Sequence, residues 1–256
     1  MKNLLMMIIG VAWPLALPGA SEGLSGGPGP EFRAGQSAVG SSLVSVPQEQ
    51  KAQGVKQALL NGVQSAIREL GHEGGFLTNL PVRIPMPHQL QTIERSLRAL
   101  KQDQLADEFV TAMNHAAERA VPEAANVFAD AISRMSIVDA ESILLGPPDA
   151  ATQYFRRATE TNLFEKFLPV VKRTTDATGV TASYKKLLQA SSGNKYVGAL
   201  LGALSDSQSL DIDAYVTNKA MDGLFKKVAE EEKRIRENPV SRTSELLRRV
   251  FGAMKR

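Results

Sequence analysis

The sequence predicts an all-α fold: an irregular bundle of about seven to nine helices, with an extended proline-rich strap near residues 76–88. Apolar residues recur at intervals of three and four, and the alternating pattern of a β-strand is almost absent. Gly, Pro and capping residues interrupt the apolar stripes, as they do at helix ends. The clearest stripe is that of Ile212, Val216, Ala220, Leu224 and Val228.

The first half of the chain divides readily into helices and one strap. A helix is predicted over 48–70, and Gly71 follows it as a terminating residue. Three prolines prevent a regular helix over 76–88, whose apolar residues predict a strap against the bundle. Further helices are predicted over 90–100 and 104–120.

The second half contains the longer helices. Pro122 suits the first turn of a helix, Ser136 caps a short one over 137–145, and Asp149 caps a long one that Pro169 kinks or splits. The remaining predicted elements are a short helix over 182–189, a candidate helix over 196–204, a long helix from Asp211 or Asp213 to Asn238, and an amphipathic turn over 246–251.

The N-terminus has the pattern of a secretory signal peptide over 1–20, with Lys2 before an apolar run at 4–17. An uncleaved anchor is the alternative, and the short run interrupted by Pro14 argues against it. Residues 21–47 predict a flexible Gly/Ser/Pro-rich leader. We therefore expect a single helical domain over 48–256, a periplasmic location and no transmembrane segment in the mature chain.

Composition excludes several classes of function. The 256 residues include no cysteine, which excludes disulfides, thiolate metal sites and a cysteine nucleophile. The net charge is +3, and the aromatic content is 5%. Such weak positive charge with few aromatic residues argues against nucleic acid as a partner.

Four phrases stand together in this chain: FLTNLPVRIPMP, DEFVTAMNHAAERAVPEA, DAATQYFRRAT and YVTNKAMDGLFKKVAEEEKRIRENPVSRTSELLRRVFG. From about residue 48 to the C-terminus the chain thereby resembles the bacterial family called domain of unknown function 4197. The resemblance implies an exported helical protein, sometimes lipidated, without an assigned activity. His115 departs from the family pattern, which usually has Arg there, so a phosphate-gripping Arg is not expected at this position.

Several polar residues are candidates for ligand binding. Arg156 and Arg157 stand at the start of a helix, where the dipole disfavours cations, so we expect them to bind an anion or to pair with acidic residues of the C-terminal helix. Arg83 lies between apolar neighbours and needs a carboxylate, for which Asp222 is the predicted partner. The candidate ligand-binding residues are Arg83, Asn114, Tyr154, Arg156, Arg157 and Asp222.

The charged run 230–236 is predicted to be a solvated helix face, with pairs Glu230–Arg234 and Glu232–Arg236 at i,i+4 spacing. A carboxylate site for metal or acid–base chemistry is the alternative, and the interleaved basic residues argue against it.

The sequence contains only half of the residue pattern that a di-metal site in a helical bundle requires. Glu108, His115 and Glu118 share one helix face, but a di-metal bundle needs a Glu-x-x-His from each of two helices. Glu69 and His72 have the spacing, but Gly71 between them ends the helix. We predict no metal site, no cofactor and no catalytic residue, since hydrolase, phosphate-loop and dinucleotide motifs are absent from the sequence.

These observations predict a non-enzymatic binding module for a hydrophobic or amphipathic acidic ligand, with Arg83, Arg156 or Arg157 at its head group. The alternative is a structural or protein-interaction module of the cell envelope, and a hydrolase using paired carboxylates comes third. The expected partner is accordingly a lipid-like ligand or an envelope protein. A carrier predicts a closed apolar cavity, whereas an interaction module predicts a filled core with an exposed apolar patch.

Overall fold

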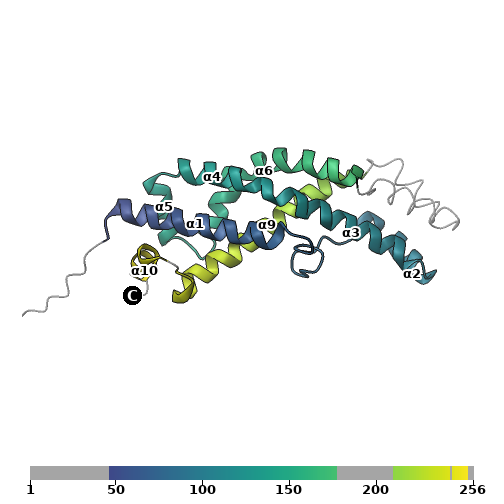
Figure 1. Ribbon diagram of the computed structural model, residues 1–256, viewed down its shortest axis with the longest axis horizontal. Helices are drawn as coiled ribbons and strands as arrows, with labels where there is room; N and C mark the ends of the chain where they lie inside the picture. The colour runs from purple at the N-terminus through teal and green to yellow at the C-terminus, as the bar shows by residue number, and fades with distance from the viewer. Residues whose placement is uncertain (1–45, 178–209, 243, 253–256) are drawn as a thin grey trace, which may run out of the picture. The chain divides into compact units, whose positions relative to one another are not determined.

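The computed structural model describes residues 46–177, 210–242 and 244–252, which form a bundle of helices without strands in those ranges (Figure 1). The predicted all-α fold is confirmed. The predicted signal peptide, residues 21–45 of the predicted leader, and the predicted helices over 182–189 and 196–204 lie outside the described residues. The elements are α1 (Gln48–Leu70), η1 (His88–Leu90), α2 (Gln91–Ala99), α3 (Asp103–Ala120), η2 (Val121–Glu123), α4 (Ala124–Arg134), α5 (Ile137–Leu145), α6 (Ala150–Ala177), α9 (Ile212–Glu237), η3 (Pro239–Ser241) and α10 (Glu245–Gly252).

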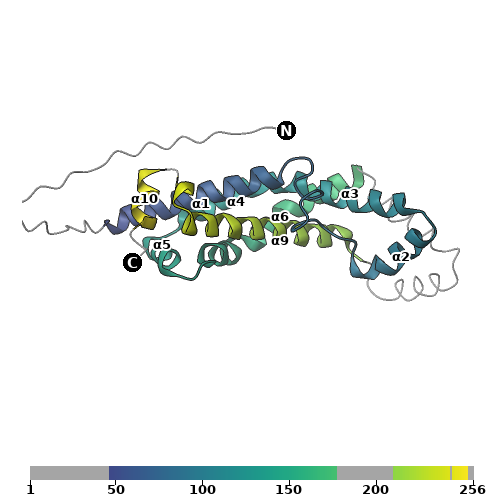
Figure 2. The ribbon, with the colours of Figure 1, turned by 90° about the horizontal axis from the view of Figure 1, so that it is seen from below.

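Helix α9 is the element on which much of the bundle packs, because it contacts α6, α1 and α3 (Figure 2). Asp211 caps its start, since the side chain accepts a 2.9 Å hydrogen bond from the backbone N–H of Ala214. Asp213 instead accepts a 2.7 Å hydrogen bond from the hydroxyl of Thr175 in α6. In the apolar stripe of α9, Val216, Ala220, Leu224 and Val228 are buried and Ile212 is half-buried, as the four-residue spacing predicts.

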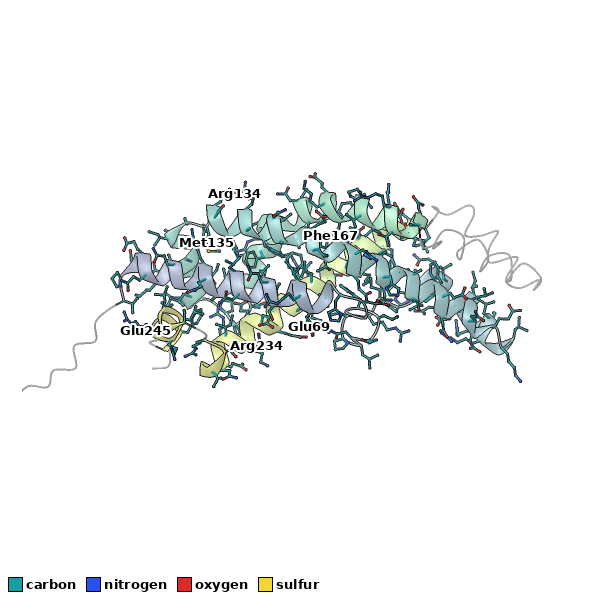
Figure 3. All side chains as sticks on the ribbon, viewed as in Figure 1. Glu69, Arg134, Met135, Phe167, Arg234 and Glu245 are labelled. Carbon is teal, nitrogen blue, oxygen red and sulfur yellow. The ribbon has the colours of Figure 1, made fainter. Side chains whose placement is uncertain are left out.

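The core between these helices is filled by large apolar side chains. The rings of Phe128 and Phe155 meet edge to face with centroids 4.9 Å apart, and Phe225 lies 6.2 Å from Phe128. Figure 3 shows Phe167 inside the bundle, whereas the charged residue Arg234 lies at its surface. Helix α6 runs through Pro169 without interruption. No helix in the described ranges has the length and apolarity needed to cross a membrane.

The charged run of α9 is a solvated face only in part: Glu230, Lys233 and Arg234 are exposed. The prediction was wrong for two of its carboxylates. Glu231 and Glu232 are each only 7% exposed. Glu232 accepts hydrogen bonds from the backbone N–H groups of Ala151 and Thr152, both 3.0 Å, and from the Thr152 hydroxyl at 2.9 Å. Because these donors belong to the first turn of α6, a carboxylate from α9 performs the capping expected of Asp149.

Of the two i,i+4 pairs predicted in this run, one forms. Arg236 binds Glu232 at 2.9 Å and also donates to the carbonyl of Ile143 at the end of α5. Glu230 pairs with Lys227 at 2.9 Å, and Arg234 pairs with Glu231. The run therefore joins α9 to the ends of α5 and α6.

Candidate functional site

The strap, residues 76–87 in the structure, is held against α3 by Asn114, whose side chain is fully buried. The amide oxygen accepts a 2.8 Å hydrogen bond from Ile84 N–H, and the amide nitrogen donates to Ile84 O and Val110 O. Both donors of the amide are thereby engaged. Asn114, a predicted ligand-binding residue, therefore positions the strap and has no free donor for a ligand.

Three further side chains fix the strap along its length through four hydrogen bonds. Oε1 of Glu118 accepts hydrogen bonds from the backbone N–H of Phe76 at 2.9 Å and of Leu77 at 3.1 Å. On the α9 side, Tyr215 and Lys226 donate to strap carbonyl oxygens at 3.1 and 2.9 Å. Residues from α3 and α9 thus set the strap's course over the bundle.

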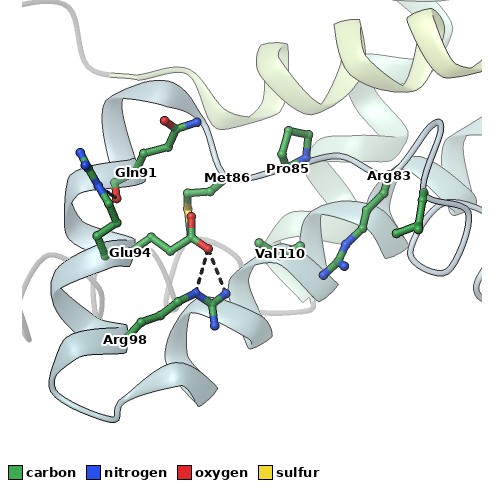
Figure 4. A pocket seen from close by; sticks show the side chains of 9 residues that line it. Arg83, Pro85, Met86, Gln91, Glu94, Arg98 and Val110 are labelled. Atoms are coloured by element: carbon green, nitrogen blue, oxygen red, sulfur yellow. Dashed lines mark hydrogen bonds and ion pairs between the residues drawn. The ribbon is translucent and has the colours of Figure 1, made fainter.

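An open cleft of about 630 Å³ lies between the strap, α2 and α3. In Figure 4, Met86 points from the strap toward Glu94 of α2, and the side chain of Arg83 extends toward Val110 of α3. This strap cleft combines an apolar floor with several guanidinium groups. Its lining residues are Leu80, Arg83, Pro85, Met86, Gln91, Glu94, Arg95, Arg98 and Val110.

The arginines of the strap cleft differ in how far their charge is neutralised. Arg98 pairs with Glu94 at 2.9 Å, Asp107 at 2.9 Å and Asp103 at 3.3 Å. The hydrogen bonds with Asp107 and Glu94 raise the pKa of Arg98 above its ordinary value, so this residue stays charged and fully paired.

Arg83 and Arg95 are the arginines of the cleft that remain available. Both are exposed, and among the described residues neither forms an ion pair with a carboxylate. Within the described ranges, the hydrogen bonds donated by Arg95 go to Gln91 O at 3.4 Å and Thr92 Oγ1 at 3.2 Å. Two guanidinium groups, one from the strap and one from α2, are therefore free to bind an anion.

The predicted pair of Arg83 with Asp222 does not form. Asp222 lies 3.4 Å from Arg156, which also pairs with Glu160 at 3.1 Å. The guanidinium carbon of Arg156 lies 4.5 Å from the centre of the Phe225 ring. Arg156 and Asp222 thus join α6 to α9, which is the helix-pairing alternative given for this arginine.

Tyr154 and Arg157 lie away from the strap cleft. The Tyr154 hydroxyl donates to Ala131 O at 3.4 Å, and burial raises the pKa of this half-buried phenol. Arg157 is exposed on α6. Of the six predicted ligand-binding residues, only Arg83 lines the cleft.

Sequence reasoning missed Arg95 and the apolar floor. The floor residues Leu80, Pro85 and Met86 belong to the strap that the prolines identified, so the signal for their location was present. Arg95 had no such signal, because only the tertiary packing of α2 beside the strap makes it face the cleft.

A family model described as "Protein of unknown function (DUF4197)" matches residues 45–252. The chain belongs to this family. No curated protein and no solved structure matched the chain. Family membership agrees with the resemblance carried by the four sequence phrases, and it leaves the activity to be inferred from the residues of the strap cleft.

Proposed function

We propose that this DUF4197 protein is a non-enzymatic binding protein whose strap cleft takes an amphipathic molecule with an acidic head group. The observation that carries the proposal is the presence of two exposed, unpaired arginines, Arg83 and Arg95, around an apolar floor in the described part of the chain. The volume of the cleft, about 630 Å³, lies within the range of small-molecule sites.

The two parts of the cleft suit the two parts of such a ligand. Guanidinium forks bind carboxylate and phosphate through paired N–H donors. The side chains of Leu80, Pro85, Met86 and Val110 offer apolar contact to an alkyl chain, at about 25 cal/mol per Å² of apolar surface removed from water. Because the cleft is open, the ligand would lie along it rather than inside the closed cavity expected from the sequence.

The same proposal assigns the protein to the periplasm. Its support is the sequence pattern of residues 1–20, with Lys2 before an apolar run. An acidic amphiphile is a component of the envelope, so the proposed ligand and the proposed location fit each other.

A binding titration with defined amphiphiles tests the proposal. Oleate and lysophosphatidate are the acidic probes, and lysophosphatidylcholine is the zwitterionic control. We expect the R83Q/R95Q double variant to bind the acidic probes at least about tenfold more weakly, because each charged hydrogen bond contributes about 1.5–3 kcal/mol. The matched control is R157Q, which removes an exposed arginine outside the cleft.

Two results of this titration would contradict the proposal. One is equal affinity of the R83Q/R95Q variant and the unmodified chain for oleate and lysophosphatidate. The other is that the unmodified chain binds lysophosphatidylcholine as tightly as it binds oleate and lysophosphatidate, which would mean that the cleft does not recognise the charge of the head group.

The alternative function, a structural or protein-interaction module of the envelope, is favoured by one observation. On α5, Ile137, Val138 and Leu145 are 41%, 71% and 72% exposed, although the core beneath is filled. Under this alternative, V138D/L145D would abolish a partner contact and leave amphiphile binding unchanged. A hydrolase with paired carboxylates has no comparable support among the described residues.

A further inference from the structure

The wall of the strap cleft that α2 forms carries, besides Arg95, an amide and a carboxylate that the proposed function does not use. Gln91 and Glu94 both line the cleft and are half-buried. They stand three residues apart, so their side chains lie on one face of the helix. Arg95 follows Glu94 directly and lines the same cleft. A pair of uncharged and acidic side chains thus adjoins one of the two guanidinium groups that are proposed to bind the head group.

The carboxylate of Glu94 is held in place through one of its two oxygens. Oε1 accepts hydrogen bonds from Nε and Nη2 of Arg98 at 3.1 and 2.9 Å. Arg98 is itself fixed by its ion pairs with Asp103 and Asp107. Among the described residues no donor binds Oε2, and in Figure 4 this oxygen points away from Arg98, on the side of Met86. Glu94 therefore presents a fixed and free acceptor to the cleft, and a ligand group that binds it must donate a proton.

The side-chain amide of Gln91 supplies the complementary donor. The backbone oxygen of Gln91 accepts from Arg95 Nε at 3.4 Å, whereas its amide has no hydrogen-bond partner within the ranges that the structure describes. A hydroxyl has one proton and two lone pairs, so a single hydroxyl can donate to Glu94 while it accepts from the Gln91 amide nitrogen. An ammonium group has no lone pair and could not accept from that nitrogen. The pair is therefore better suited to a hydroxyl than to an amine.

We infer that Gln91 and Glu94 make the strap cleft specific for acidic amphiphiles that carry a hydroxyl beside the acidic group, as the glycerol unit of a monoacylglycerol phosphate does. This inference rests on the proposed function, because it concerns the head group that Arg83 and Arg95 are proposed to bind. The arginines recognise the charge of the head group, and Gln91 with Glu94 recognises its hydroxyl. Glu94 also selects by repulsion, since a second acidic group in place of the hydroxyl would meet a like charge.

Isothermal titration of the full chain with two probes that differ in one hydroxyl tests the inference. The probes are oleoyl lysophosphatidate and the analogue in which propanediol replaces glycerol, which lacks the free hydroxyl. We expect the unmodified chain to bind lysophosphatidate about tenfold more tightly than the analogue, because the hydroxyl forms a hydrogen bond with a charged carboxylate. In Q91A/E94A the preference should fall below about twofold, while both probes still bind through Arg83 and Arg95.

The matched control is Q104A/E108A, which removes the same two residue types from an exposed, hydrogen-bonded pair on α3 outside the cleft. This variant should keep the full preference for lysophosphatidate. Circular dichroism verifies that each variant is folded. Because the measured quantity is the ratio of two affinities in the same variant, a general change in net charge or stability does not imitate the expected result.

Two outcomes would overturn the inference: equal affinity of the unmodified chain for the two probes, or an undiminished preference for lysophosphatidate in folded Q91A/E94A. The proposed function survives either outcome when both probes bind the unmodified chain and R83Q/R95Q weakens both. If neither probe binds the unmodified chain, the proposed function itself is contradicted, and the inference about the hydroxyl is overturned with it.

Discussion

Glu232 illustrates how a single buried carboxylate holds two helix ends together. It binds the first-turn N–H groups of α6 and pairs with Arg236, which in turn binds the carbonyl of Ile143 in α5. A buried charge is tolerated only when its hydrogen bonds are satisfied, as they are here on both the acidic and the basic side.

Removing this carboxylate charge should destabilise the fold strongly. We expect E232Q to lower the free energy of unfolding by about 3–5 kcal/mol, because Arg236 loses its buried partner and α6 its cap. Urea denaturation followed by circular dichroism measures the change. The control E230Q alters a carboxylate that is 48% exposed, and about 0–1 kcal/mol is expected there. Equal losses in the two variants would mean that the network around Glu232 contributes nothing specific.

A second prediction about a single residue concerns Gly223 of α9. A Cβ at this position would lie 2.6 Å from the buried ring of Phe76 at the start of the strap. We expect G223A to lower the free energy of unfolding by about 1–3 kcal/mol through overpacking, despite the better helix propensity of alanine. In G62A on α1, the new Cβ meets Glu231 Cβ at 3.4 Å, so that variant should be neutral or slightly stabilising. A stabilised G223A protein would contradict the packing described here.

Among the elements, α5 shows most clearly how both ends of a short helix are satisfied. At its start, Ser136 Oγ accepts from Asp139 N–H at 3.0 Å, and the Asp139 carboxylate accepts from Ser136 N–H at 2.9 Å. At its end, Arg236 donates to the carbonyl oxygens of Ile143 and Leu144. The first contact is local and was predicted from Ser136, whereas the second comes from a residue 92 positions beyond Leu144.

The capping box of α5 gives the fold a specific pH dependence. Hydrogen bonds from the Ser136 side chain and backbone hold the pKa of Asp139 below its ordinary value of 3.8. The stabilisation is therefore present above the unfolded-state pKa and is lost as the pH falls through the lower folded-state pKa. We expect the wild type to exceed D139N in urea midpoint at pH 7, by a difference that shrinks below pH 3.8. A difference that is constant over this range would contradict the assignment.

At the scale of the whole molecule, features that depend on neighbouring residues could be predicted from the sequence, whereas features that depend on long-range contacts could not. The bounds of α1 and α5, the proline strap and the cap at Asp211 follow from neighbouring residues, so they were predictable. The fold class follows in the same way. The buried position of Glu232 was not predictable, because its partners lie 81 and 80 residues away and an i,i+4 charge pattern is ordinarily a solvated face.

In the candidate site too, the residue marked by its sequence neighbours was predicted and the one placed by tertiary packing was not. Arg83 was identified because an arginine between apolar neighbours stands out locally, but its expected partner Asp222 binds Arg156 instead. Arg95 joins Arg83 only because α2 packs beside the strap, and a helix-surface arginine carries no local mark of such a neighbour. Sequence periodicity predicts which face of a helix is buried, and it does not predict which polar groups of two elements share a cleft.

Native mass spectrometry of the protein purified gently from its own envelope tests the central proposal most directly. We expect the unmodified chain to carry extra mass that disappears on denaturation and fragments as an acidic amphiphile. The same mass should be retained by R157Q and missing from R83Q/R95Q. A ligand-free mass for the unmodified chain, or equal retention by R83Q/R95Q, would contradict the proposal that the strap cleft holds an acidic amphiphile.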